Sequence, residues 1–145
     1  MNLRHVGITV KDIDLAKNFY CNLLGFEIKR EMLEQGKFID SISGLQNVSV
    51  TTVKMIHPES SSSGMLELLK YESHDTQTNR LQINNGGITH FAITVKDLRG
   101  LHKKLKENNV EFNCEPSVSD DGGALVTFCR DFEGNLIELV EIIQK

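Results

Sequence analysis

The chain has 145 residues, of which 39% are hydrophobic and 25% are charged, a composition typical of a globular domain with its own core. Its formal net charge of -4 and its scattered lysines and arginines argue against nucleic acid as a partner. No apolar run approaches the ~20 residues of a membrane span, so we expect no membrane partner.

The first predicted element is a half-buried strand over residues 3–10. Its side chains alternate, with Val6, Ile8 and Val10 on one side and His5 on the other. A helix is expected next, because apolar residues then recur at helical spacing. Asp12 is a suitable N-cap and Gly25 a suitable C-cap for this helix.

Short apolar runs follow the helix and predict three strands. These runs are residues 26–30, 48–56 and 65–71. The last two are separated by the turn-rich stretch HPESSSSG, residues 57–64, which is typical of a hairpin. The first half of the chain therefore predicts the order β-α-β-β-β.

The second half repeats this unit. THFAITVKDL (89–98) repeats RHVGITVKDI (4–13), and His90 takes the place of His5. The later elements match in order: a strand over 88–95, a helix over 97–108, and strands over 110–114, 124–130 and 136–143. We therefore predict one domain over 1–145, with a first module at about 1–72, a connection at 73–87 and a second module at about 88–145.

The predicted fold class is α+β, with two βαβββ modules. One helix can cover only one face of each sheet, which leaves the face that carries His5 or His90 open. If the two open faces pair, they form a cupped, half-closed mixed β barrel with the helices outside. Both histidines would then line its interior.

Each module also carries a glutamate in a matching strand: Glu67 in MLELLKY (65–71) and Glu138 in LIELVEI (136–142). A carboxylate between leucines must face either water or a group that requires charge, because burying it alone is costly. Taken singly, such a histidine is usually a hydrogen-bonded residue and such a glutamate a solvated one. Their repetition in register favours a site for one divalent metal ion, held by His5, Glu67, His90 and Glu138.

Three segments carry a resemblance to a known family. HVGITVKDIDLAKNFYCNLLGF (5–26) resembles the amino-terminal signature of glyoxalase I, and GGITHFAITVKD (86–97) resembles its second signature, with Thr89 in place of the usual Gly or His. DFEGNLIEL (131–139) resembles the DPxGNxxEL ending of the vicinal oxygen chelate superfamily, which includes glyoxalase I, bleomycin resistance proteins and extradiol dioxygenases. The resemblance covers essentially the whole chain.

The resemblance implies paired βαβββ modules around a metal whose ligands are His5, Glu67, His90 and Glu138. It also implies a lyase or isomerase of the glyoxalase I (lactoylglutathione lyase) type, in which Glu138 and Glu67 are the candidate catalytic bases for a proton next to a carbonyl. The metal can be nickel, cobalt, zinc, manganese or iron. The substrate is a small molecule, and family members commonly form homodimers.

Alternative functions remain open within this resemblance. Thr9 stands where bacterial glyoxalase I typically has an arginine that holds glutathione, so a methylmalonyl-CoA epimerase-like enzyme is the main alternative. The substrate is then an acyl-CoA instead of a 2-oxoaldehyde–thiol adduct. An extradiol dioxygenase or an antibiotic-binding resistance protein is less favoured, because four protein ligands suit neither class.

The cysteines, the other histidines and several phenylalanines are expected to have structural roles. The three cysteines are odd in number and widely spaced, which predicts reduced thiols packed as small apolar residues in a cytoplasmic protein. We expect three histidines and an Arg130–Asp131 pair at the surface, and three phenylalanines in the core or in the wall of the cavity. The cysteines are Cys21, Cys114 and Cys129, the histidines are His57, His74 and His102, and the phenylalanines are Phe38, Phe91 and Phe128.

Overall fold

The structure is a computed structural model that describes residues 1–60, 64–78 and 80–143. It divides the chain into two units, Met1–Thr78 and Asn79–Lys145. Each unit contains a four-stranded mixed sheet in which the first strand is parallel to the last and the other neighbours are antiparallel. The predicted α+β class with two βαβββ modules is therefore confirmed.

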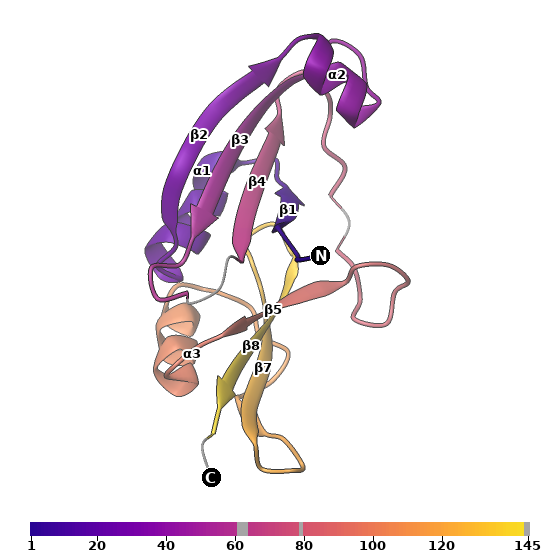
Figure 1. Cartoon of the computed structure of the whole chain (residues 1–145). Helices are drawn as coiled ribbons and strands as arrows, with labels where there is room; N and C mark the ends of the chain where they lie inside the picture. The colour runs from indigo at the N-terminus through magenta and orange to yellow at the C-terminus, as the bar shows by residue number, and fades with distance from the viewer. Residues whose placement is uncertain (61–63, 79, 144–145) are drawn as a thin grey trace. The chain divides into compact units, whose positions relative to one another are not determined.

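The first unit has the sheet order β1-β4-β3-β2 (Figure 1). Its elements are β1 (His5–Thr9), α1 (Ile13–Lys17), the π-helical segment η1 (Asn18–Leu23), β2 (Glu27–Gln35), α2 (Lys37–Ser43), β3 (Ser49–Ile56) and β4 (Met65–Tyr71). Asp12 caps α1 as predicted, because its Oδ1 accepts hydrogen bonds from the N–H groups of Asp14 at 3.1 Å and Leu15 at 2.9 Å.

The core of the first unit lies between its sheet and the helical segment formed by α1 and η1. Phe19 and Tyr20 of this segment are fully buried, as are Val53, Met55 and Leu68 of the sheet. Figure 1 shows α1 beside one face of this sheet. The alternation of side chains along the strands leaves His5 and Glu67 on the opposite face, which the α1–η1 segment does not cover.

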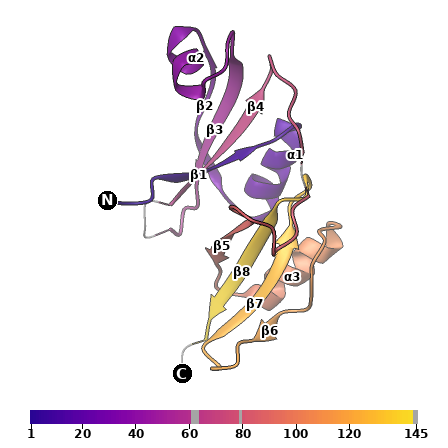
Figure 2. The ribbon, with the colours of Figure 1, turned by 90° about the vertical axis from the view of Figure 1, so that its right-hand side faces the viewer.

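The second unit has the sheet order β5-β8-β7-β6 (Figure 2). Its elements are β5 (His90–Thr94), α3 (Leu98–Glu107), β6 (Ser117–Val118), β7 (Ala124–Arg130) and β8 (Leu136–Ile142). The carboxylate of Asp97 caps α3 by accepting a hydrogen bond from the N–H group of Gly100 at 2.9 Å. Leu98 and Leu105 of α3 are fully buried, as are Ile137 and Leu139 of β8.

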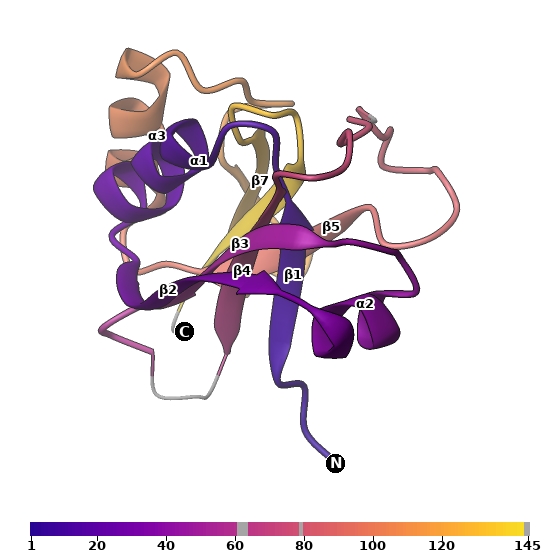
Figure 3. The same ribbon diagram turned by 90° about the horizontal axis from the view of Figure 1, so that it is seen from above.

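Three local predictions differ from the structure. Residues 110–114 do not form the expected strand; this stretch makes one isolated bridge, Phe112 to Cys129, and the strand β6 comes later. The helix after Asp12 is α-helical only as far as Lys17 and continues as the π-helical η1. The helix α2, which Figure 3 shows after the end of β2, was not expected.

Two further predictions concern loops and membrane spans. The expected hairpin turn at residues 57–64 lies partly outside the described residues, because the description stops at 60 and resumes at 64. Within the described residues, none of the helices has the length and apolar character needed to cross a membrane.

Candidate metal centre

In the first unit, the fold brings His5 and Glu67 together. The parallel strands β1 and β4 pair Gly7 with Glu67, so His5 lies two residues before the position opposite the acid. Side chains two residues apart point to the same face of a sheet. His5 Nε2 is 3.3 Å from Glu67 Oε2, and the side chains are 37% and 12% exposed.

The second unit repeats this relationship with His90 and Glu138. Ala92 of β5 pairs with Glu138 of β8, so His90 again lies two residues before the position opposite the acid. His90 Nε2 is 3.7 Å from Glu138 Oε2, and the side chains are 34% and 26% exposed. Each histidine and its glutamate therefore occupy the same register in both sheets.

Both pairs combine donor atoms that are typical of metal ligands. Imidazole nitrogen and carboxylate oxygen bind zinc at about 2.0–2.2 Å, so two such donors on one ion lie roughly 3 to 3.5 Å apart at angles of about 90–110°. The 3.3 Å separation in the first pair lies within this range, whereas the 3.7 Å separation in the second pair is slightly longer. Each pair thus has donor atoms of the kinds that bind a divalent ion, and each unit by itself provides two of them.

The convergence of the two pairs on one ion stays a prediction. Among the described residues, neither unit gathers three or more histidine, cysteine, aspartate or glutamate side chains that could hold a metal ion. His5 and Glu67 belong to Met1–Thr78, whereas His90 and Glu138 belong to Asn79–Lys145.

Thr89, which departs from the second glyoxalase I signature, is also a neighbour of the second pair. Its Oγ1 lies 3.0 Å from Nδ1 of His90. When Nδ1 carries the proton and donates to this hydroxyl, Nε2 presents its lone pair towards Glu138. Its position directly before His90 was a sequence signal for such a contact.

The two pairs differ in the residue across the sheet from the acid. Lys54 of β3 lies opposite Glu67, with its Nζ 3.4 Å from Glu67 Oε1. Phe128 of β7 lies opposite Glu138, and its ring centroid is 5.1 Å from that of His90 in an edge-to-face arrangement. One acid therefore has a cationic neighbour and the other an aromatic one.

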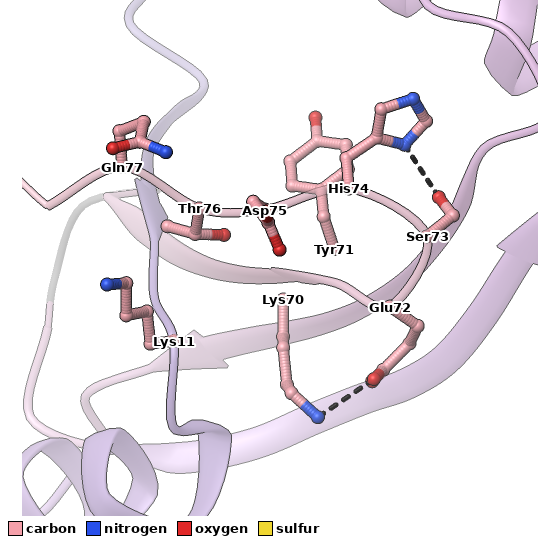
Figure 4. A pocket seen from close by; sticks show the side chains of 9 residues that line it. All are labelled: Lys11, Lys70, Tyr71, Glu72, Ser73, His74, Asp75, Thr76 and Gln77. Carbon is pink, nitrogen blue, oxygen red and sulfur yellow. Dashed lines mark hydrogen bonds and ion pairs between the residues drawn. The ribbon is translucent and has the colours of Figure 1, made fainter.

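A cavity of about 510 Å³ in the first unit lies away from these pairs. Figure 4 shows the residues that line it, and neither His5 nor Glu67 is among them. The lining is Lys11, Lys70, Tyr71, Glu72, Ser73, His74, Asp75, Thr76 and Gln77. Lys70 Nζ forms an ion pair with Glu72 Oε2 at 2.8 Å, so opposite charges largely balance there.

Two surface predictions were wrong. His102 is only 6% exposed because it lies on the buried side of α3, where it packs against Phe112 with ring centroids 4.3 Å apart. Arg130 is 7% exposed, and its guanidinium donates to the carbonyl oxygens of Gly134 at 2.5 Å and Leu81 at 2.9 Å. The helical spacing of His102 from Leu98 and Leu105 was a sequence signal for its burial.

The cysteines and phenylalanines divide between core and surface. Cys129 is buried, and this burial raises the pKa of its thiol to about 12. Cys21 is partly buried, whereas Cys114 is exposed, contrary to the expected packing. Phe38 is 74% exposed, which excludes a core role for it in this unit, whereas Phe91 and Phe128 are half-buried.

The histidines His57 and His74 are half-buried. The ring of His57 contacts Phe26 at a centroid distance of 5.5 Å, and Nδ1 of His74 lies 2.7 Å from Ser73 Oγ. Neither contacts Glu67, so neither competes with His5 for a place in the first pair.

Comparison with protein-family models matches residues 2–139 to the Glyoxalase/Bleomycin resistance protein/Dioxygenase superfamily. The chain belongs to this superfamily, as its repeated modules and its final DFEGNLIEL segment predicted. The superfamily includes both enzymes and resistance proteins. Membership alone therefore does not specify an activity.

Named relatives include two kinds of enzyme. The chain is 26% identical over 146 residues to a probable lactoylglutathione lyase from Synechocystis sp., with 100% of this chain and 98% of the relative covered. It is 27% identical over 143 residues to an ethylmalonyl-CoA/methylmalonyl-CoA epimerase from Cereibacter sphaeroides, with 97% of each covered. A crystal structure of a glyoxalase family protein from Bacillus cereus has the same fold, with a TM-score of 0.89 at 21% identity over 99% of this chain and 95% of that chain.

Proposed function

We propose that this protein is a divalent-metal-dependent lyase or isomerase of the glyoxalase I type, which moves a proton on the carbon next to a carbonyl group. The observation that carries this proposal is the repeated histidine–glutamate pair, His5 with Glu67 and His90 with Glu138, in the same register of both sheets. These four residues would hold a divalent ion, which would supply a Lewis acid for an oxygen of the substrate.

Glu138 and Glu67 are the candidate bases in this reaction. Each carboxylate is partly buried, and each has its oxygen within 4 Å of the histidine of its own unit. Glu67 is additionally bound to Lys54 through Oε1, whereas Glu138 faces an aromatic neighbour across the sheet. Glu138 therefore has more freedom to swing towards a substrate carbon, and we assign it the main role in proton transfer.

The proposed substrate is the adduct of a 2-oxoaldehyde with a thiol, because relatives that match 97–100% of this chain are named lactoylglutathione lyase or probable lactoylglutathione lyase. A methylmalonyl-CoA epimerase-like activity is the second candidate. Relatives of that name match 94–97% of this chain at 27–28% identity. Both reactions remove a proton beside a carbonyl, so the same four residues serve either one.

The metal in this proposal is one divalent ion per chain, drawn from nickel, cobalt, zinc, manganese and iron. The functional protein is proposed to be a homodimer acting on a small molecule. Four protein ligands would suit an ion that supports proton transfer better than one used for oxygen activation, and they would not be needed for simple drug binding.

The decisive experiment follows exchange of the substrate proton for deuterium by NMR in heavy water. The protein is loaded with zinc, nickel or cobalt and given the methylglyoxal–glutathione adduct or methylmalonyl-CoA. We expect metal-dependent exchange with one of these substrates. Glu138→Gln should slow it by about 100-fold or more, the usual contribution of a positioned acid–base residue.

The matched control is Glu141→Gln on the same strand. Glu141 lies three residues after Glu138, on the other face of the sheet, and its Oε2 accepts a hydrogen bond from the N–H group of Leu98 at 2.8 Å. Glutamine keeps an acceptor oxygen there, so this variant should exchange at the unaltered rate. The proposal fails if the metal-loaded protein exchanges neither substrate, or if both variants lose the same activity.

A further inference from the structure

Lys54 places a positive charge beside the first histidine–glutamate pair. Its Nζ is 3.4 Å from Oε1 of Glu67, while His5 Nε2 approaches the other oxygen, Oε2, at 3.3 Å. An ammonium group has three N–H donors, and the contact with Glu67 occupies one of them. The Lys54 side chain is 31% exposed, so its remaining donors are accessible from solvent.

Arg30 extends this charge along the sheet. It lies directly opposite Lys54 on β2, just as Glu67 lies directly opposite Lys54 on β4. Directly opposed residues of antiparallel strands share one face and have Cβ atoms about 4.5–5.5 Å apart. Arg30, Lys54 and Glu67 therefore form a row on the face that carries His5, with two cations and one carboxylate.

The fold does not require this row. In the second unit, the position that matches Lys54 is Phe128, which lies opposite Glu138 and packs against His90. Like charges on directly opposed strand positions destabilise a sheet. The Arg30–Lys54 pair therefore does not stabilise the fold. A cationic row that one module has and its counterpart lacks is better explained by binding of an anion.

We infer that Lys54 and Arg30 bind a carboxylate group of the substrate beside the predicted metal ligands. The row has a net charge of +1, which one carboxylate group of a ligand neutralises. The guanidinium of Arg30 suits a planar carboxylate, and Lys54 adds a point charge. The substrate class is thus a carbonyl compound that also carries a carboxylate group.

This inference rests on the proposed function for the reaction, whereas binding of the acid can be measured without it. Malonate is the probe, and the measurement is a titration of isotope-labelled, metal-free protein followed through its amide NMR signals. We expect the largest shifts around Arg30 and Lys54 in β2 and β3. Lys54→Met should weaken malonate binding by about tenfold or more, as expected for loss of a charge-assisted hydrogen bond.

Lys70→Met is the matched control. Lys70 belongs to the neighbouring strand of the same sheet, has a similar side-chain exposure of 33% and also forms an ion pair, with Glu72. It lies three residues from Glu67 and therefore on the opposite face. Lys70→Met should bind malonate like the original protein, and Lys54→Arg should retain most of the affinity.

Several results would overturn the inference: no malonate binding by the original protein, shifts centred elsewhere, or equal effects of Lys54→Met and Lys70→Met. Tighter binding of inorganic phosphate with the same dependence on Lys54 would overturn the assignment to a carboxylate. A parallel zinc titration separates this inference from the proposed function. If the protein binds zinc but Lys54→Met binds malonate normally, this inference fails and the proposed function stands. If Lys54→Met weakens malonate binding but the protein binds no zinc, the proposed function fails and only the carboxylate-binding site stands.

Discussion

Lys54 and Phe128 occupy matching positions in the two sheets, each directly opposite the glutamate of its own histidine–glutamate pair. Lys54 contacts Glu67 through an ion pair, whereas Phe128 contacts His90 through its ring. The duplicated modules thus present equivalent candidate ligands in different surroundings, one cationic and one aromatic. In the proposed reaction, this difference gives the two carboxylates different parts, as two acids in unlike environments commonly have.

Metal stoichiometry distinguishes one joint site from two separate ones. We expect one zinc ion per chain in calorimetric titration. His5→Ala and His90→Ala should each weaken zinc binding by more than about 100-fold, because each removes a ligand of the same ion. Loss of a residue that only hydrogen-bonds to a ligand costs up to about 100-fold. His74→Ala, in the connection after β4, is the control. Two ions per chain, with one retained in each variant, would contradict the joint site.

Thr89 should tune metal binding through His90. Its Oγ1 is 3.0 Å from His90 Nδ1, and loss of such a partner typically lowers metal affinity by about 10–100-fold. We expect this loss for Thr89→Val in a competition titration with a zinc chelator. Thr94→Val changes an exposed threonine at the end of β5, the strand that carries His90, and should have no effect. Equal affinities for both variants would show that Thr89 does not orient the imidazole.

Arg130 should contribute to stability instead of catalysis. Its guanidinium holds the carbonyl oxygens of Gly134 and Leu81, so Arg130→Met leaves both acceptors without this donor. We expect a loss of about 2–4 kcal/mol in the free energy of unfolding, measured with urea. Arg4→Met alters an exposed residue before β1 and should change stability by less than about 0.5 kcal/mol. A similar small change for Arg130→Met would refute this role.

The three cysteines should react with a thiol reagent in the order of their exposure. Exposed Cys114 should be modified first at pH 8, and the buried thiol of Cys129, with a pKa raised to about 12, should be modified only on unfolding. Mass spectrometry of the modified peptides measures the order. In Cys114→Ser the fast phase should disappear; rapid labelling of Cys129 in the folded protein would contradict its burial.

The raised pKa of Cys129 also gives a pH dependence with a definite sign. The folded chain keeps this proton above pH 9.0, the ordinary value at which the unfolded thiol loses it. The stability that Cys129 contributes is therefore complete below pH 9 and is lost as the pH rises towards 12. Urea unfolding of the original protein and of Cys129→Ala should show a difference that shrinks over this interval; a constant difference would contradict the assignment.

Much of each unit was predictable because its local signals agree with its tertiary contacts. Strands β4 and β7 have the predicted limits, and Asp12 caps its helix as expected. The short helix α2 escaped prediction because it has only seven residues and buries Ile39 alone, while Phe38 and Ile42 are exposed. It therefore lacks the apolar stripe by which an amphipathic helix is recognised.

Other errors arose where neighbours in sequence suggested the wrong partners. Arg130 stands beside Asp131, which suggested a surface ion pair, but its guanidinium reaches backbone carbonyls instead.

Residues 110–114 have the apolar content of a strand. Their backbone makes only scattered bonds to β7, such as the N–H group of Asn113 donating to the carbonyl oxygen of Phe128 at 2.9 Å.

The sequence by itself indicated the duplication, the order of elements and the four candidate ligands, because internal repeats and alternating side chains can be recognised without a structure. Only the tertiary structure decided that each histidine lies within 4 Å of its own glutamate, and that Lys54 and Phe128 stand across from those acids. The physical reason is register. Which residues oppose each other depends on how strands far apart in sequence align their backbone hydrogen bonds, and local patterns specify the face of a side chain but not its cross-strand neighbour.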